Sequence, residues 1–457
     1  MKQTKSFEID MCNGTLMDKL ISFSIPLMLS GILQLMFNAV DIIVVGRFAG
    51  SESLAAVGST TALINVFTNL FIGISLGSNV LAARYYAAGK EREMSETVHS
   101  SLTLALISGI LMAFAGLFFS RTALEWMGTP DDVIDLAALY MKIYFIGMPF
   151  FMLYNYGAAI LRAVGDTKRP LLFLVVSGLV NAGLNMIFVI CFHMAVEGVA
   201  IATVISQLLS CIMVLSCLYR TQSCYQFRFS KLGLKSIYVL QIFQVGIPAG
   251  IQSTVINFSN VLLQSSVNSF GSIAMAGYTA ANNIFGFLYT SVNSVTQACM
   301  SFTSQNYGAG DYRRIKKIAM ISVVTGVVTT ELLSVLAVYF GPQLLGIYSP
   351  SAEVVAAGMV RLRWIALFYG LDAIMDVIVG SLRGVGYNIL PMLVTLMGAC
   401  ASRLIWLSTV FRLPAYHRIE MVYIVYPLSW ALTATTHLIC YFFVSRKVDR
   451  ELRAHEA

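Results

Sequence analysis

The sequence carries little charge for its length. Only 12% of its 457 residues are Asp, Glu, Lys or Arg, whereas 57% are hydrophobic, and the mean hydropathy is +0.76. Soluble domains contain roughly twice that fraction of charged residues. The composition therefore excludes an ordinary soluble domain and indicates a chain that is surrounded largely by lipid.

Cysteine and histidine are also few. The eight cysteines form no CxxC pair, the five histidines are dispersed, and HExxH and Walker sequences are absent. We therefore expect no disulfide, no cofactor and no enzymatic activity. A cleavable signal is not expected either, because the first twenty residues, "MKQTKSFEIDMCNGTLMDKL", lack an apolar core.

Long apolar runs recur from end to end. Crossing a bilayer takes about 20 apolar residues in a helix, and by this criterion the sequence predicts an all-α polytopic membrane protein with twelve transmembrane helices. In the first half they start near Asp18, Ser53, Thr97, Ile134, Pro170 and Gly198, and in the second half near Ile237, Ala274, Ile318, Val354, Leu390 and Met421.

The basic residues predict the orientation, because Lys and Arg resist translocation. Most of them lie before the first expected span or in alternate connections: Lys2, Lys5, Lys19, Arg84, Lys90, Arg92, Arg162, Lys168, Arg169, Arg220, Arg228, Lys231, Lys235, Arg313, Arg314, Lys316 and Lys317. Both termini are therefore expected to be cytoplasmic, in a bacterial inner (plasma) membrane. The net charge of +7 indicates contact with anionic membrane lipids rather than nucleic acid.

The sequence of one short turn occurs twice in the chain. "LRAVGDTKRP" at 161–170 and "LRGVGYNILP" at 382–391 are 221 positions apart, and the same offset relates "GSESLAAVG" from Gly50 to "GSIAMAGYT" from Gly271. The chain is therefore read as a duplication of a six-span unit. Because six is even, the two lobes are expected to share one orientation and to be related by a pseudo-two-fold axis along the membrane normal.

The duplication predicts the domain boundaries and the role of the turn. The expected lobes are residues 1–217 and 237–446, with a cytoplasmic linker at 218–236 and a cytoplasmic tail at 447–457. Gly165 and Gly386 are expected to permit the tight turns, while Arg162 and Arg383 are expected to meet anionic headgroups.

Several motifs then resemble one transporter family. "GVAIATVISQ" (198–207), "NAGLN" (181–185), the paired "LR.VG" turns, the "IP" near the start of each half and the Asp of "FNAVDIIVVGRFAG" (37–50) are similar to the multidrug and toxic compound extrusion (MATE) family. The resemblance covers nearly the whole chain. It implies a secondary exporter, expected to be a monomer, of small amphipathic or cationic compounds, driven by H⁺ or Na⁺ and working by alternating access.

A lipid-linked oligosaccharide flippase of the same superfamily is the alternative. Such a flippase would be expected to carry several basic residues within its cleft to hold pyrophosphate. The charges that the sequence places inside the spans are mainly acidic, and we interpret them as favouring cationic cargo.

Polar groups inside the first half form one candidate site. Asp41 lies within an apolar span, where an ionised carboxylate is costly and calls for a functional reason. Asn181 and Asn185 are four residues apart and so share a helix face, and Thr203 lies in the sixth span. The resemblance implies that these positions form a cation site for H⁺ or Na⁺, although family members often carry Asp where this chain has Asn185. The two amides could instead bond neighbouring backbone.

The second half has its own acidic residues. Asp372 and Asp376 are four residues apart, so their carboxylates share one helix face and should not both ionise comfortably. Asp372 matches a position used for cation coupling in some branches of the family. Asp376 could instead pair with Arg403, and Glu331 is interpreted as solvated or capped. His437, inside the last span, is read as a hydrogen-bonded packing residue.

The substrate surface is predicted from spans one and four. We expect an apolar, adaptable wall with a few polar points to face a central cleft between the lobes. The candidate residues are Gln34, Phe37, Tyr140, Met148, Met152 and Asn155.

Overall fold

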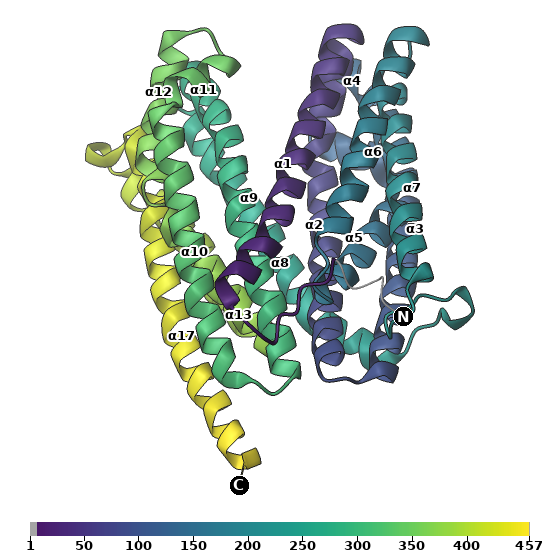
Figure 1. The fold of residues 1–457 in the computed structure, drawn as a ribbon. Helices are drawn as coiled ribbons and strands as arrows, with labels where there is room; N and C mark the ends of the chain where they lie inside the picture. Colours follow the sequence, from purple (N-terminus) through teal and green to yellow (C-terminus); the bar gives the residue numbers. More distant parts are fainter. Residues whose placement is uncertain (1–6, 457) are drawn as a thin grey trace. The chain divides into compact units, whose positions relative to one another are not determined.

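A computed structural model describes residues 7–456, which form helices without a strand among them (Figure 1). Lys2 and Lys5 lie outside the described residues. Along the first half the elements are α1 (Leu16–Phe48), α2 (Gly50–Ala87), α3 (Glu91–Trp126), α4 (Asp131–Ile146), α5 (Met148–Ala163), α6 (Lys168–Met186), the π-helical η1 (Ile187–Cys191), α7 (Val196–Arg220), the 3₁₀ turn η2 (Phe229–Lys231) and α8 (Ser236–Asn268).

The second half continues with further long helices and several short ones. Its elements are α9 (Ser272–Gly308), α10 (Tyr312–Tyr339), α11 (Gly341–Tyr348), α12 (Ala352–Ala366), α13 (Tyr369–Val385), α14 (Ile389–Thr395), the π-helical η3 (Leu396–Ala401), α15 (Ser402–Ser408), the 3₁₀ turns η4 (Val410–Arg412) and η5 (Pro414–Tyr416), α16 (Ile419–Tyr423) and α17 (Val425–Glu456).

The chain divides into two compact units, each a bundle of helices. The N-terminal unit comprises residues 1–10 and 29–250, and the C-terminal unit comprises residues 11–28 and 251–457. The divisions fall inside α1 and α8, close to Pro26 and Pro248, which are internal to those helices. An internal proline removes one backbone hydrogen bond and weakens a helix at that point.

The predicted spans correspond to helices of the structure. Among the described residues, nine helices are long and apolar enough to cross a membrane, and two bent helix pairs each make one further span. The one remaining predicted span, near Ala274, coincides with α9, which is long but contains many amides, including Asn282, Asn293 and Gln297. This all-helical layout confirms the predicted fold class.

Two spans are broken, a feature that the hydropathy of the sequence does not predict. The pair α4 and α5 bends by 47° and the pair α12 and α13 by 49°. In the first pair Pro149 sits at the start of α5, where proline is tolerated because the first helical N–H groups have no partner inside the helix. The equivalent break in the second unit, at Leu367 and Phe368, contains no proline.

Glycines allow α2 to pack closely against the first part of α8 within the N-terminal unit. A Cβ atom on Gly73 would lie 2.4 Å from the Cα atom of Gly250, and one on Gly77 would lie 2.2 Å from the carbonyl oxygen of Ile242. Small residues four apart are the usual means of bringing membrane helices into backbone contact. This contact therefore depends on glycine at these positions.

The duplicated turns have the predicted glycine geometry. Gly165 and Gly386 have φ values of +98° and +108°, in the left-handed region that glycine adopts without strain. The prediction for Arg383 is wrong. Its side chain is buried, and Nη2 donates to Oε1 of Gln252 at 2.7 Å, because that amide meets the need of a buried guanidinium for an acceptor.

Candidate functional site

Three helices of the N-terminal unit bring the four predicted polar residues together. Asp41 comes from α1, Asn181 and Asn185 from α6, and Thr203 from α7. The Nδ2 atom of Asn185 donates a hydrogen bond to Oδ1 of Asp41 and a second one, of 3.3 Å, to Oδ1 of Asn181. The spacing of four residues along α6 therefore places the two amides in direct contact.

The hydrogen bonds continue into α7 as a directed chain. Asn181 Nδ2 donates to Thr203 Oγ1 at 3.4 Å, and Thr203 Oγ1 donates to the carbonyl oxygen of Val199 at 2.9 Å. The amides thus bond to side chains, not to neighbouring backbone as the alternative interpretation supposed. A change in what the Asp41 carboxylate accepts can pass along this chain, because each member holds the orientation of the next.

One buried acceptor in this cluster is unused. The Asn185 side chain is fully buried, yet its Oδ1 atom accepts no hydrogen bond from any residue that the structure describes. An unpaired buried carbonyl oxygen is costly, so it is expected to serve a proton donor or a cation in some state of the protein. Carboxylate, amide and hydroxyl oxygens are also ligands suited to Na⁺.

Two aromatic residues border the Asp41 cluster. Tyr140, predicted as a cleft residue, is buried on α4 and stacks with Tyr144 at 6.1 Å between ring centroids. Both tyrosines interact electrostatically with Asp41, and Gln207 of α7 contacts Tyr144. Sequence reasoning missed Tyr144 and Gln207, although Tyr144 follows Tyr140 by four residues and so shares its helix face.

The other predicted cleft residues have varied surroundings. Gln34 is exposed on α1, whereas the ring of Phe37 lies against Gly178 of α6, where a Cβ atom would be 1.9 Å from it. Asn155 donates its Nδ2 hydrogen bond to the carbonyl oxygen of Phe151 on its own helix. Met148 and Met152 are fully buried. Gln34 is thus the most accessible of this set.

The acidic pair of the C-terminal unit lies on α13. Asp372 is buried and Asp376 half-buried, and the two carboxyl groups interact electrostatically. Arg403 is not the ion-pair partner of Asp376. Its guanidinium donates to Ser429 at 2.9 Å and to Asn260 at 3.3 Å. Arg383, seven residues after Asp376 on the same helix, is the basic residue whose positive charge interacts electrostatically with the Asp376 carboxyl group.

The charges inside the C-terminal unit are not mainly acidic, which corrects the sequence-based expectation. Arg361, Arg383 and Arg403 are all buried there. Arg361 donates to the carbonyl oxygen of Tyr278 at 2.6 Å and lies over its ring. Amides, hydroxyls, carbonyls and aromatic rings contact these guanidinium groups, which is why their burial could not be inferred from nearby carboxylates.

Two other polar groups inside the C-terminal unit have structural partners. Glu331 Oε1 accepts a hydrogen bond of 2.7 Å from the backbone N–H of Gly370, so Glu331 caps the N-terminus of α13, where a negative charge is favourable. His437 is buried, and its Nε2 atom lies 3.0 Å from Thr395 Oγ1. Both predictions, a capping glutamate and a hydrogen-bonded histidine, are confirmed.

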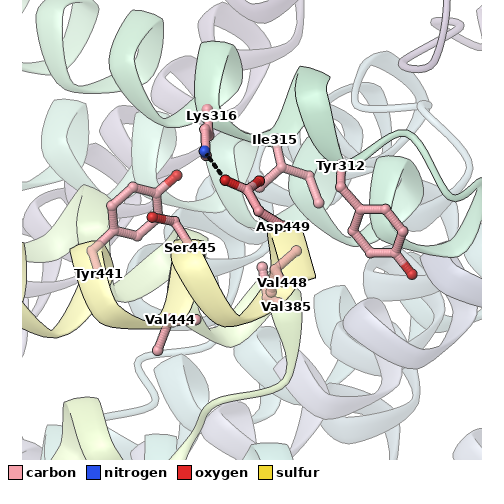
Figure 2. A pocket seen from close by; sticks show the side chains of 9 residues that line it. All are labelled: Tyr312, Ile315, Lys316, Val385, Tyr441, Val444, Ser445, Val448 and Asp449. Carbon is pink, nitrogen blue, oxygen red and sulfur yellow. Dashed lines mark hydrogen bonds and ion pairs between the residues drawn. The ribbon is translucent and has the colours of Figure 1, made fainter. Parts of the chain in front are cut away.

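A small cavity near the end of α17 is too small for a substrate. It holds about 10 Å³ and lies beside the ion pair between Lys316 of α10 and Asp449 of α17 (Figure 2). That space is about enough for one water molecule. The ion pair joins two helices, and the cavity is not a candidate site.

Similarity to known proteins agrees with the duplicated architecture. The sequence model of the MatE family matches residues 26–187 and again residues 248–406. The chain is 29% identical to the probable multidrug resistance protein YoeA of Bacillus subtilis (strain 168), with 93% of each chain covered. It is 27% identical to the probable multidrug resistance protein YpnP of the same organism, over 82% of this chain and 84% of that one.

The fold comparison covers almost every residue. A solved structure described as the outward-facing conformation of a multidrug resistance MATE family transporter of the MOP superfamily matches with a TM-score of 0.91 and 21% identity, over 98% of this chain and all of the other. That likeness shows the fold, and the match to the MatE family model extends over both halves of the sequence. The chain therefore belongs to the MatE family.

Proposed function

We propose that the protein is a secondary active multidrug exporter that antiports amphipathic or cationic compounds against H⁺ by alternating access, with Asp41 as the coupling residue. Family membership and the names of the relatives support drug export. These names do not favour the flippase alternative. The observation that carries the coupling site is the hydrogen-bonded chain from Asp41 through Asn185 and Asn181 to Thr203.

The direction of the hydrogen bonds suggests how a proton acts. Asp41 accepts a hydrogen bond from the Asn185 amide N–H, which suits an ionised carboxylate. A protonated carboxyl group has an O–H to donate. Asn185 can accept it only by presenting its unused Oδ1 atom, and rotating the amide also breaks the bond from Nδ2 to Asn181. Protonation thus favours a second arrangement of α1 against α6 and α7.

Exchange follows from competition for one negative charge. A bound drug cation stabilises the ionised carboxylate, and a proton neutralises it, directly or through the rearranged hydrogen bonds. Each ligand therefore favours a different arrangement, which is the requirement for coupled transport. We propose Asp372 and Asp376 as a second coupling site in the C-terminal unit, and both termini as cytoplasmic.

The ion is assigned from the number of carboxylates. Asn185 leaves Asp41 as the single acid of the cluster, and one proton neutralises it completely. A second carboxylate would remain ionised around bound Na⁺. The unused Asn185 oxygen also suits Na⁺, so both gradients are compared in the test.

Purified protein in proteoliposomes tests the coupling. Drug efflux is measured first under a pH gradient without sodium, and then under a sodium gradient at equal pH. We expect the pH gradient to drive efflux. A response only to sodium would contradict the proton assignment while leaving drug export intact.

Export itself is tested in a bacterium that lacks its own efflux pumps. Expression should lower the accumulation of ethidium and of cationic antimicrobials. Unchanged accumulation across a broad panel, with the protein present in the membrane, would contradict the proposed function.

A further inference from the structure

An apolar groove lies between α2, α3 and α4 of the N-terminal unit. Its volume is about 260 Å³, and its walls include Phe67 of α2 and Phe119 and Trp126 of α3. Phe119 is 66% exposed and Trp126 is 86% exposed, so the groove reaches the surface of the unit. The Ser120 hydroxyl bonds to the carbonyl oxygen of Gly116 on its own helix, which leaves an almost wholly apolar lining.

The floor of the groove is formed by Phe145 and depends on one glycine. Phe145 of α4 is buried, and its ring contacts Phe67 edge-on at 6.0 Å between centroids. A Cβ atom on Gly116 would lie 2.1 Å from the Phe145 ring. Glycine at position 116 therefore allows the Phe145 ring of α4 to pack directly against α3, and this contact forms the bottom of the groove.

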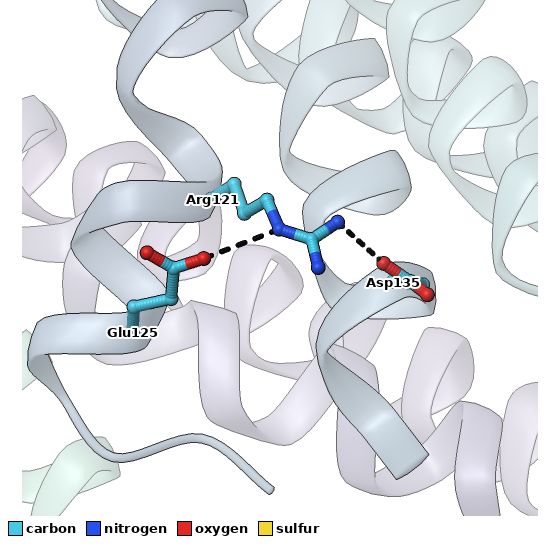
Figure 3. Close-up of polar contacts among 3 residues, drawn as sticks. All are labelled: Arg121, Glu125 and Asp135. Carbon is cyan, nitrogen blue, oxygen red and sulfur yellow. Dashed lines mark hydrogen bonds and ion pairs between the residues drawn. The ribbon is translucent and has the colours of Figure 1, made fainter. Parts of the chain in front are cut away.

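A cluster of charged residues lies near the C-terminal end of α3, next to the groove. Arg121 lies between two carboxylates, with Nε 3.2 Å from Glu125 Oε1 on α3 and Nη1 2.7 Å from Asp135 Oδ1 on α4 (Figure 3). All three side chains are more than half exposed. Trp126 follows directly in sequence, and exposed tryptophans are typical of the headgroup level of a membrane.

The local charge is strongly acidic despite the basic chain. Residues 121–135 contain one basic residue, Arg121, and four acidic ones: Glu125, Asp131, Asp132 and Asp135. Such a surface repels phosphatidylglycerol and cardiolipin, whose headgroups are only negative. It is complementary to a headgroup that carries an ammonium group as well as a phosphate, because the carboxylates can bind the ammonium and Arg121 the phosphate.

We propose that this groove binds one acyl chain of a phosphatidylethanolamine, whose headgroup is held by Arg121, Glu125 and Asp135. The apolar lining suits a hydrocarbon chain, and the charges select the zwitterionic headgroup. Both parts are adjacent on α3, so a single lipid can satisfy both.

The repeat shows that the site is not part of the shared scaffold. At the offset of 221, Arg121, Glu125 and Asp135 correspond to Pro342, Gly346 and Ala356, and Phe145 corresponds to Ala366. The C-terminal unit therefore lacks the headgroup charges and the aromatic floor at the equivalent positions. The proposed lipid site belongs to the N-terminal unit alone.

Quenching of tryptophan fluorescence tests the proposal. The full-length protein is placed in nanodiscs that contain increasing fractions of phosphatidylethanolamine or phosphatidylglycerol with brominated acyl chains. The Trp126 signal is obtained by subtracting the Trp126→Phe variant. We expect half-maximal quenching at an about tenfold lower fraction of the ethanolamine lipid, as one charge-assisted contact would produce.

Matched variants separate the two parts of the site. Ala115→Phe fills the groove and should abolish the preferential quenching, whereas Leu117→Phe, on the same helix but outside the groove, should retain it. Asp135→Asn should lower the preference for ethanolamine over glycerol lipids without filling the groove. Equal quenching by both lipids, or an unchanged response in Ala115→Phe, would overturn the proposal, and neither result depends on drug transport.

Discussion

At the scale of single residues, Asp41 differs from most acids inside a protein because its hydrogen-bond partner is an amide and not a Lys or Arg. A neighbouring Lys or Arg would hold the carboxylate ionised. The Asn185 amide can accept as well as donate, so it can bond to either protonation state of Asp41. This interchangeability is what a group that must exchange its ion requires.

Asp41→Asn should abolish transport while the protein still folds. The amide has nearly the same shape as the carboxyl group but cannot take up a proton or balance a cation. Dye efflux from cells and antiport in proteoliposomes should both fall to background. Size-exclusion chromatography in detergent checks the fold, and near-normal efflux from a well-folded variant would move the coupling site elsewhere, with Asp372 and Asp376 as the next candidates.

Asn185→Asp should increase the dependence of transport on sodium. The substitution gives the cluster two carboxylates, so one can stay ionised around Na⁺ while the other binds a proton. The expected result is measurable efflux under a sodium gradient at equal pH, a condition under which we expect the parent protein to respond only weakly. The same response in variant and parent would show that position 185 does not determine the ion.

At the scale of elements, the two copies of the turn are alike in backbone and different in surroundings. The carbonyl oxygen of Gly165 accepts a hydrogen bond of 3.1 Å from the backbone N–H of Ile9, and a Cβ atom at Gly165 would lie 2.3 Å from the Ile9 carbonyl oxygen. The first turn thus holds the segment that precedes α1, and its glycine is needed for space as well as for conformation.

Alanine at the two glycines should therefore have unequal effects. Gly386→Ala should cost about 1–2 kcal/mol from the left-handed backbone alone, because φ is +108° there. Gly165→Ala should cost more, since strain adds to the clash with Ile9. Thermal unfolding of the purified variants in detergent measures the difference, and equal losses would contradict the role assigned to the Ile9 contact.

The first turn should also make stability depend on pH. Burial raises the pKa of Asp166 to about 6, although Asp166 accepts a hydrogen bond from the backbone N–H of Arg169 and forms an ion pair with its side chain. The folded protein then binds this proton more tightly than the unfolded chain, whose aspartates have a pKa of about 3.9. This tighter proton binding stabilises the folded protein fully below about pH 4, and the stabilisation is lost as the pH rises through about 6.

Asp166→Asn should remove that dependence. The variant should unfold at a higher temperature than the parent above about pH 7 and at a similar temperature near pH 4, with a difference of at most roughly 3 kcal/mol for a shift of this size. Thermal unfolding of both proteins across this range measures it. A parallel pH profile for parent and variant would show that Asp166 does not titrate in this way.

At the scale of the whole molecule, duplication preserved the helices and let the interior charges diverge. The offset of 221 places Leu262 at the position of Asp41, and Phe151 and Asn155 at the positions of Asp372 and Asp376. The C-terminal unit also buries three arginines. One unit thus contains an acid that is hydrogen-bonded to an amide, whereas in the other unit Asp372 interacts electrostatically with Arg403 and Asp376 with Arg383.

This difference predicts that neutralising an acid lowers the thermal stability of the protein by different amounts in the two units. Asp376→Asn should lower the unfolding temperature, because it leaves Arg383 buried without its nearby negative charge, whereas Asp41→Asn should leave it almost unchanged. Adding Arg383→Gln to Asp376→Asn should restore part of the loss. A double-mutant cycle on thermal stability measures the interaction, and strictly additive effects would show that the two residues are independent.

Composition, hydropathy and the internal repeat determined the membrane class, the approximate number of spans and the paired glycine turns. These features depend on local chemistry, because the cost of placing a residue in lipid and the left-handed turn each act over short segments. The contact between Asn181 and Asn185 followed from their spacing on one helix. Their association with Asp41 and Thr203 rested on resemblance to a family.

Only the tertiary structure determined which helix faces pack against one another. It showed the breaks at Gly147 and at residues 367–368, the inward position of Arg383, the interaction of Tyr144 with Asp41 and the proximity of Gln207 to Tyr144. In a sequence that is apolar on nearly every helix face, periodicity does not distinguish a face that contacts lipid from one that contacts another helix. The partners of each polar group are therefore determined by helix packing, because burial alone obliges each of them to find an acceptor or donor nearby.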